Sequence, residues 1–119
     1  MATFTIAQIS EKHGGDTTEY LPHVDGRVVC ACLRLDYNPG APGVILPGDD
    51  PDVQLWASVL CQQGGAIPVY IRHQADAWEY VGEYEVERSS QLPADIAEHP
   101  RAIHLAKIKV SRVIWMRKI

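Results

Sequence analysis

IPVYIRHQADAWEYVGEYEVER, residues 67–88, decides the fold, because it holds two strand-like runs on either side of a short turn. Residues 67–73 are rich in β-branched and aromatic types, and the QAD tripeptide that follows has turn composition. From Trp78 to Glu87, apolar side chains then alternate with glutamates. This alternation is typical of a strand with one face on a core, so the stretch predicts a β-hairpin with its aromatic side chains inward.

Two positions interrupt the alternation, because Val81 stands among the glutamates and Gly82 among the aromatic residues. A glycine inside a strand marks a bulge, a bend or a place where another group approaches the backbone. Since Tyr80 and Tyr84 flank it on the same expected face, Gly82 would leave a notch between two aromatic rings. We expect either a corner of a curved sheet or the floor of a slot in which a planar nucleobase stacks.

Charge is divided unevenly along the chain. The net charge of −4 argues against a protein that grips phosphates by bulk charge, but residues 101–119 contain six basic residues and no acid. A last strand is expected at about 105–118, with Lys107 and Lys109 on one face. We expect these lysines to form cross-strand ion pairs with hairpin glutamates, each contributing about 0.2–1 kcal/mol. The glutamates concerned are Glu83, Glu85 and Glu87.

The clearest helix is expected at 51–63, where an aspartate pair can cap the N-terminus, Pro51 suits the first turn and two glycines follow the end. The order of elements predicts an α+β fold with a curved, mostly antiparallel sheet or a small β-barrel, packed by this one helix. The other elements are expected as strands at 3–9 and 28–37, a long loop at 10–27, a short extended piece at 44–46 and a short helix at about 93–99.

Length and composition indicate a single domain spanning residues 1–119. No apolar run approaches the ~20 residues of a membrane span, and the start lacks the pattern of a secretory signal, so we expect a cytoplasmic protein with no membrane partner. The three cysteines and five histidines are scattered without paired ligand spacing. We therefore expect buried free thiols, no metal and no cofactor.

No catalytic motif supports an enzyme. The sequence has no GxSxG, HExxH or phosphate-binding glycine-rich motif. Cys61 lies late in the predicted helix, whereas activated thiols favour a helix N-terminus. Arg34 and Asp36 are expected to form a surface ion pair. We expect no catalysis, and a small hydrolase using Cys61 or His73 ranks behind two non-catalytic alternatives.

The hairpin resembles the strand–turn–strand of SRA-like and related PUA-like modules, which occur alone or with bacterial modification-dependent restriction enzymes. The residues that carry the resemblance are those from Glu79 to Val86, EYVGEYEV. The proline-rich loop and the helix before the hairpin support it, and the resemblance covers about 36–88 in all. The resemblance implies a PUA-like barrel that recognises a modified or flipped base. Where SRA modules carry an acid that bonds the base, this chain has Val81, which leaves stacking on aromatic rings.

We therefore expect a nucleic-acid-binding module for DNA or RNA that recognises a modified or unstacked base without catalysis. The alternative is a protein-interaction or regulatory module on the same barrel, without nucleic-acid binding. An effector protein is a further candidate partner. The expected base contacts are Trp78, Tyr80, Gly82, Tyr84, Arg72, His73 and Asn38, and the expected backbone contacts are Arg112, Arg117 and Lys118.

Overall fold

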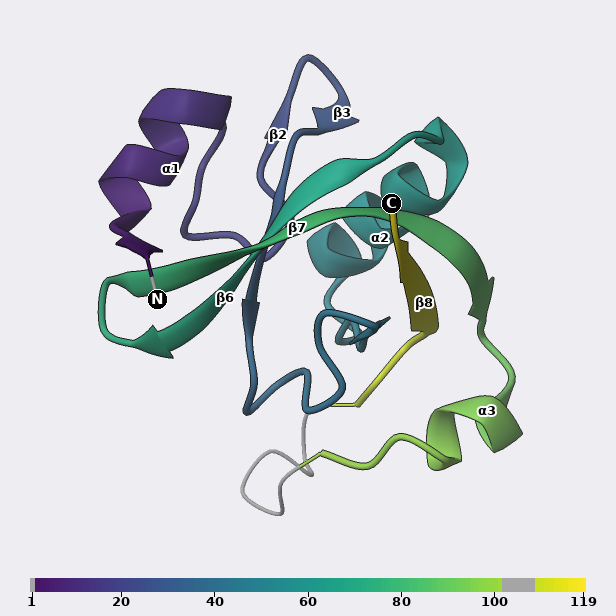
Figure 1. Cartoon of the computed structure of the whole chain (residues 1–119). Coiled ribbons are helices and arrows are strands. Elements are labelled where there is room, and N and C mark those ends of the chain that lie inside the picture. The colour runs from purple at the N-terminus through teal and green to yellow at the C-terminus, as the bar shows by residue number, and fades with distance from the viewer. Residues whose placement is uncertain (1, 102–108) are drawn as a thin grey trace.

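The predicted hairpin forms the centre of a six-stranded sheet. In the computed structural model, which describes residues 2–101 and 109–119, β6 (Ile67–Gln74) and β7 (Ala77–Ser90) pair antiparallel around a two-residue turn. The two strands run side by side across the molecule, and β7 curves as it continues toward β8 (Figure 1). The hairpin prediction is thus confirmed.

The other strands extend the sheet on both sides of the hairpin. The sheet order is β4-β6-β7-β8-β5, and β1 pairs with the start of β7. Only the β4–β6 pairing is parallel among the described pairs. The path ends at β4 and at β5, so the described strands form an open sheet and not a closed barrel. Their bounds are Thr3–Phe4 (β1), Ala31–Arg34 (β4), Val44–Ile45 (β5) and Val113–Lys118 (β8), with a separate pair His23–Val24 (β2) and Arg27–Val28 (β3).

An extra residue in β7 explains the interrupted alternation. Val69 pairs with Gly82, whereas the next residue, Tyr70, pairs with Tyr80, which leaves Val81 as the additional residue of a β-bulge. Gly82 has a φ of +125°, a conformation that residues with a side chain rarely adopt. The insertion exchanges the two faces of the strand, so even-numbered residues before and after it lie on opposite sides of the sheet.

The two sides of the sheet carry different cores. One side holds the main core, to which α2 (Pro51–Gln63) contributes Ala57 and Leu60 and β7 contributes Tyr84. The other side holds a smaller cluster beneath α1 (Ile6–His13), which includes Tyr70 and Trp78. The expectation of one inward aromatic face is therefore wrong, because the bulge sends the aromatic side chains to both sides.

Two helices were predicted and one was not. The helix at 51–63 is confirmed, and the short helix is α3 (Pro93–Ala97). The strand predicted at 3–9 is wrong beyond β1, because Thr5 caps a helix instead: its side chain accepts from the Gln8 amide, and the Gln8 side chain accepts from the Thr5 amide. No helix in the described ranges is long and apolar enough to cross a membrane.

The last strand is shorter than predicted, and it pairs through a different residue. Lys107 lies outside the described residues, and Lys109 precedes β8 without belonging to a strand. The ion pair that does join β7 and β8 links Arg117 to Glu85, which face each other in register. The predicted attraction between the basic end and the glutamates is present in this pair, and Lys109, the predicted lysine within the described residues, has no ion pair among them.

Candidate functional site

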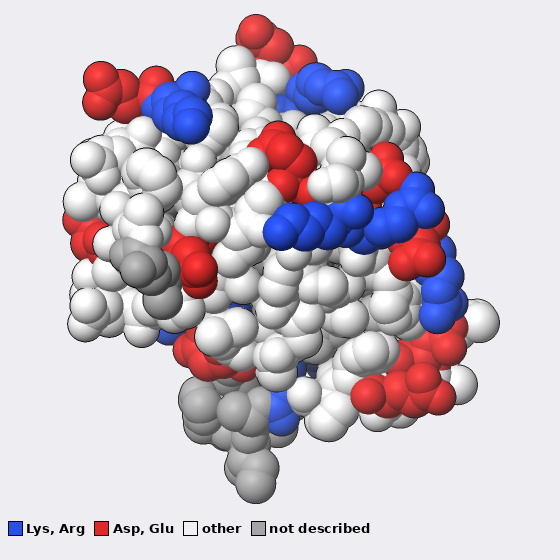
Figure 2. All heavy atoms as spheres, in the orientation of Figure 1, with Lys and Arg blue, Asp and Glu red and all other residues white. Residues whose placement is uncertain are grey.

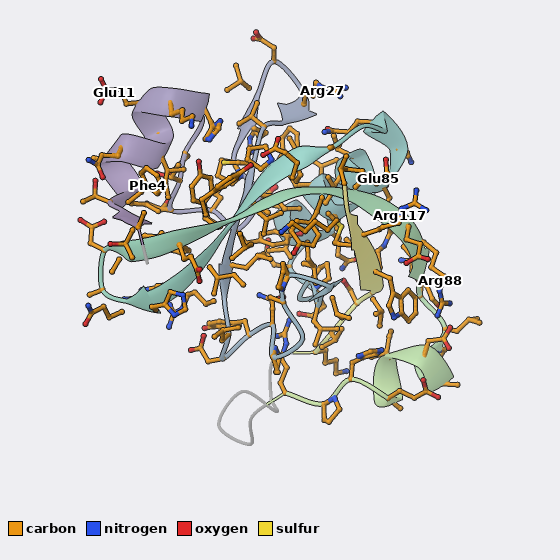
Figure 3. The ribbon with its side chains drawn as sticks, in the orientation of Figure 1. Phe4, Glu11, Arg27, Glu85, Arg88 and Arg117 are labelled. Atoms are coloured by element: carbon orange, nitrogen blue, oxygen red, sulfur yellow. The ribbon has the colours of Figure 1, made fainter. Side chains whose placement is uncertain are left out.

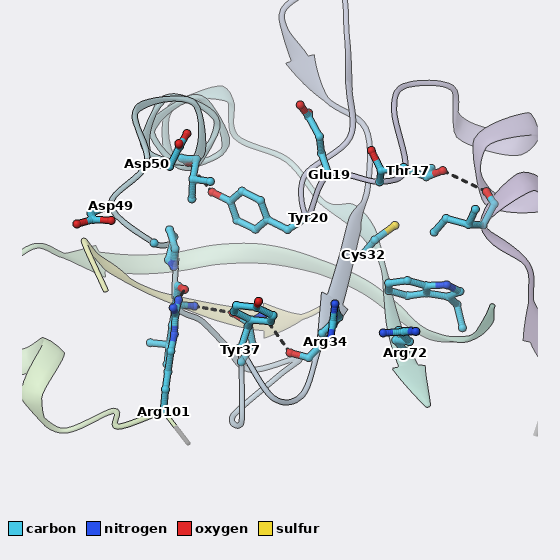
Figure 4. A pocket seen from close by; sticks show the side chains of 18 of the residues that line it. Thr17, Glu19, Tyr20, Cys32, Arg34, Tyr37, Asp49, Asp50, Arg72 and Arg101 are labelled. Carbon is cyan, nitrogen blue, oxygen red and sulfur yellow. Dashed lines mark hydrogen bonds between the residues drawn. The ribbon is translucent and has the colours of Figure 1, made fainter. Parts of the chain in front are cut away.

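A cleft of about 590 Å³ opens beside β4, at the edge of the sheet (Figure 4). The sheet contributes side chains from β4, β6 and β7 on the side that α1 covers. The opposite side of the cleft comes from residues 17–20, the loop around 46–50 and the first turn of α2. Pockets that bind small ligands span about 300–1,000 Å³, so this cleft is large enough for a nucleotide-sized group.

Three side chains cross the sheet in a line along the cleft. Trp78 of β7 pairs in register with Arg72 of β6, which pairs in turn with Arg34 of β4. All three line the cleft, and neighbouring strands lie roughly 4.8 Å apart. An aromatic ring and two guanidinium groups therefore follow one another over about two strand spacings.

The line continues beyond the sheet through the loop after β4. Arg34 Cζ lies 5.2 Å from the centre of the Tyr37 ring, and Arg101 Cζ lies 5.7 Å from the same centre. Both distances are within the range of cation–π attraction. Figure 4 shows Arg101, Tyr37, Arg34 and Arg72 in this order along one side of the cleft. We call the five residues Trp78, Arg72, Arg34, Tyr37 and Arg101 the cleft row.

The arginines of the cleft row differ in their partners. Arg34 pairs with Asp36 at 3.1 Å, which confirms the predicted surface ion pair. Arg101 donates from Nη2 to the Leu46 carbonyl, and burial lowers the pKa of its guanidinium, which stays charged because arginine is not deprotonated in proteins. Within the described residues, no carboxylate lies within ion-pair distance of Arg72. Arg72 and Arg34 lie in register, and like charges in register repel each other. An anion bound between the two guanidinium groups would reduce this repulsion.

Carboxylates gather on the other side of the cleft. Glu19, Asp49 and Asp50, which we call the acidic wall, line it together with Tyr20. Asp50 caps α2 by accepting from the Asp52 amide at 2.9 Å. Its carboxylate therefore already stabilises the N-terminus of the helix. These positions also lie toward the upper side of Figure 4, across from the cleft row.

Interactions with neighbouring residues fix two side chains on this side of the cleft, Glu19 and Tyr20. Glu19 pairs with His23 at 3.2 Å, and the His23 ring stacks on Trp56 with centres 3.4 Å apart. The Tyr20 hydroxyl donates to the Val53 carbonyl at 2.6 Å. Burial raises the pKa of Tyr20 well above its usual range, and Arg112 opposes this rise only in part. Tyr20 is therefore a neutral, fixed ring at neutral pH.

Three of the predicted contact residues line the cleft: Trp78, Arg72 and Asn38. Asn38 is only 4% exposed, and its side chain bonds to the backbone of its own loop. Its Oδ1 accepts from the Leu46 amide at 2.9 Å, and its Nδ2 donates to the Arg34 carbonyl at 3.2 Å. Asn38 thus shapes the cleft, whereas the prediction had it reading a base edge.

The predicted slot around Gly82 is absent from the described residues. Tyr80 and Tyr84 lie on opposite sides of the sheet because of the bulge, and Tyr84 is buried in the main core. Tyr80 is 43% exposed, and its hydroxyl donates to Glu83. A Cβ added to Gly82 would lie 2.8 Å from Cε of Lys118, so the chain's own lysine covers the notch.

The remaining predicted residues lie away from the cleft row. His73 bonds to Glu79 at 2.7 Å on the surface near the hairpin turn. Arg112 precedes β8 and is half-buried. Arg117 is paired with Glu85, and these two side chains point toward one another in Figure 3. Basic and acidic side chains adjoin in the same way over this part of the surface in Figure 2.

Sequence reasoning missed Tyr37 and Arg101 as site residues, and it assigned Arg34 only its ion pair with Asp36. The strand predicted at 28–37 is shorter in the structure, because β4 ends at Arg34 and Leu35 is 42% exposed. The NPG sequence directly after Tyr37 could have indicated this, because it is typical of a turn and favours an earlier end of the strand. Tyr37 then need not follow the alternation of the strand. No local sequence pattern predicts that Arg101 lies beside Tyr37, because the packing of segments distant in the sequence brings the two together.

Among the described residues that line the cleft, the cysteine is not an activated nucleophile. Cys32 lines it, but the hydrogen bond with Cys30 and burial raise the pKa of the Cys32 thiol far above its usual range. Cys61, on α2, does not line the cleft. In the described part of the chain, no three histidine, cysteine or carboxylate side chains come together as metal ligands. The geometry is suited to holding a ligand by stacking and by charge.

No curated protein and no solved structure matches the chain. A family model, however, matches residues 3–118, which include every helix and strand around the cleft. The chain therefore belongs to the family described as Domain of unknown function (DUF6697).

Proposed function

We propose that the protein is a nucleic-acid-binding module that holds an unstacked base in the cleft, without catalysis of its own. The observation that carries the proposal is the cleft row, in which aromatic rings and guanidinium groups follow one another along a single cleft. Proteins that bind single-stranded or unpaired nucleic acid combine aromatic rings for the bases with cations for the backbone.

The chemistry of each part supports this role. The rings of Trp78 and Tyr37 both line the cleft, Trp78 with 8% of its surface exposed, and base–aromatic stacking contributes about 1–3 kcal/mol per base. Arg72 and Arg34 supply charge for a phosphate beside the rings. The cleft row thus replaces the tyrosine slot and the C-terminal basic residues as the proposed site.

The similarity of residues 36–88 to SRA-like and PUA-like modules supports the same proposal and extends it to a PUA-like fold and a modified base. The acid that those modules place at Val81 is missing, but the acidic wall contributes carboxylates at another place in the fold. Carboxylates accept hydrogen bonds from base amino groups such as N4 of cytosine. We propose that Glu19 or Asp49 takes this part.

Fluorescence anisotropy with labelled oligonucleotides, plain and base-modified, tests the proposal over a salt series. We expect saturable binding whose logarithm falls linearly with the logarithm of salt concentration, with a slope that reports the phosphates contacted. The Arg72→Gln variant should bind more weakly with a shallower slope, whereas the matched Arg117→Gln variant should bind like the wild type. Flat traces with every oligonucleotide at low salt would reject the proposal and favour the protein-interaction module.

A further inference from the structure

We infer that the cleft binds a single strand with at least two consecutive nucleotides splayed apart, and not one base flipped out of a duplex. This inference rests on the proposed function, and it names the form of nucleic acid that the cleft row recognises. Three features carry it: two aromatic stations, by which we mean the Trp78 ring and the Tyr37 ring, each with a guanidinium group beside it; the distance between the two stations; and the charge that faces them.

The first feature is that the cleft row has an aromatic ring at two separate places. Trp78 stands at one end of the row, and Tyr37 stands between Arg34 and Arg101 at the other. Each ring has at least one guanidinium beside it, because Arg72 is the register partner of Trp78. A site for one flipped base needs one ring with a guanidinium group beside it, whereas this cleft has two.

The second feature is the spacing of the stations. Trp78 and Arg34 are separated by two strand spacings, roughly 10 Å, and Tyr37 lies beyond Arg34 in Figure 4. Consecutive bases in a stacked strand are only about 3.4 Å apart. Two bases on these stations therefore cannot stack on each other. The strand must be extended, with Arg72 and Arg34 facing the phosphate between the two bases.

The third feature is the charge around the cleft row. The acidic wall faces it with Glu19, Asp49 and Asp50, which would repel a second phosphate chain. Double-stranded DNA carries about one negative charge per 1.7 Å of its axis, so its binding requires an extended basic surface. A single strand satisfies this arrangement, and a duplex does not.

Competition against a labelled single-stranded octamer of deoxycytidine tests the inference. The competitors are dCMP, the dinucleotide d(pCpC), its RNA counterpart, and a duplex with one unpaired cytosine. We expect d(pCpC) to compete at a concentration at least about tenfold below that of dCMP, because the second base adds its own stacking contribution. The duplex should compete more weakly than the single strand. The RNA dinucleotide distinguishes an RNA ligand from a DNA ligand.

Variants assign the advantage of the dinucleotide to the two stations. Tyr37→Ala should bring the potency of d(pCpC) close to that of dCMP, and Trp78→Ala should do the same. Because Trp78 is only 8% exposed and packs in the smaller cluster, Arg72→Gln provides a second test at that end if Trp78→Ala does not fold. Tyr80→Ala is the matched control, since this exposed tyrosine lies outside the cleft row and should leave the ratio unchanged.

The failures of the two proposals can be told apart. If dCMP competes as well as d(pCpC), or the duplex with the unpaired cytosine competes best, the inference is overturned while the proposed function stands. If the octamer itself does not bind at low salt, both are overturned. A loss of the dinucleotide advantage in Tyr80→Ala equal to that in Tyr37→Ala would also overturn the inference.

Discussion

Two regions of this protein are rich in basic residues, and they differ in what their charges contact. At the end of β8, Arg117 is paired with Glu85, and Lys118 lies over the backbone of Gly82. In the cleft row, Arg72 has no carboxylate partner within the described residues and lies in register with Arg34. Within the basic segment that is conspicuous in the sequence, Arg117 is compensated by Glu85, whereas the arginines of the cleft row converge on an open cleft.

The cause is strand pairing. Because β8 lies antiparallel beside β7, Arg117 faces Glu85 in register, and Lys118 lies opposite Tyr84. The parallel pairing of β4 with β6 instead places one arginine beside another. Like charges that face each other cost free energy, so this arrangement is better understood as a feature of a site than as a contribution to stability. Local charge in a sequence therefore does not identify the charge that is available to a ligand.

The largest expected effect comes from removing charge in each region. Arg72→Gln should weaken the binding of a single-stranded oligonucleotide by about 10- to 100-fold, since it removes the proposed charge-assisted phosphate contact. Arg117→Gln should change the affinity by less than about twofold, because its partner Glu85 already neutralises it. Anisotropy titrations in the same buffer compare them. Equal losses in the two variants would remove the distinction between the regions.

The next effect concerns how the cleft is built. Asn38→Ala should destabilise the protein by about 1–3 kcal/mol, because the buried Leu46 amide loses its acceptor. Urea unfolding followed by tryptophan fluorescence measures this change. Asn38→Asp at acidic pH, where a neutral carboxyl keeps an acceptor for the Leu46 amide and a donor for the Arg34 carbonyl, is the control and should lose less relative to the wild type at the same pH. Wild-type stability in Asn38→Ala would mean that the loop does not depend on this side chain.

A smaller effect is expected at the bulge, beside the basic end. Gly82→Ala should cost about 1–2 kcal/mol, since the positive φ of this position is strained for alanine. The lysine above it contributes little of this cost, because the flexible end of Lys118 can move aside. The double variant Gly82→Ala/Lys118→Ala separates the two terms. If it regains full stability in thermal melting, the cost was steric and the backbone argument is incorrect.

The smallest effect is expected from the ion pair at the end of β8. Glu85→Gln should lower stability by about 0.2–1 kcal/mol and lose that difference at high salt, as expected for an exposed cross-strand pair. It should also raise oligonucleotide affinity slightly, because Arg117 is released. Reversal of Lys109, which lies outside β8, should leave the melting temperature unchanged and serves as the control. A larger loss in the lysine variant would restore the pairing predicted from the sequence.

Local patterns predicted those elements that local interactions determine. The helix at 51–63 follows from its aspartate cap and its glycine end, and the hairpin follows from alternation around a turn. The helix from Ile6 was also readable, because Thr5 and Gln8 have the spacing of a capping box, but the β-branched residues around them favoured a strand.

The site was less predictable than the fold, because it depends on contacts between distant segments. An alternating sequence gives the faces of a strand only while the register is continuous, and the bulge at Val81 ends that continuity. Tyr80 and Tyr84 were therefore assigned to one slot that they do not share. Arg101 and Arg34 meet the same ring although 67 positions separate them in the sequence, and no periodicity encodes such a meeting.

The bulge also limits which insertions and deletions β7 can tolerate. Removing Val81 would restore the two-residue repeat between Trp78 and Val86, and the side chains on one side of the deletion would then exchange faces. Either Trp78 would leave the cleft or Tyr84 would leave the main core. One inserted residue thus couples the integrity of the core to the composition of the cleft, so insertions and deletions are far less tolerable here than in the loops.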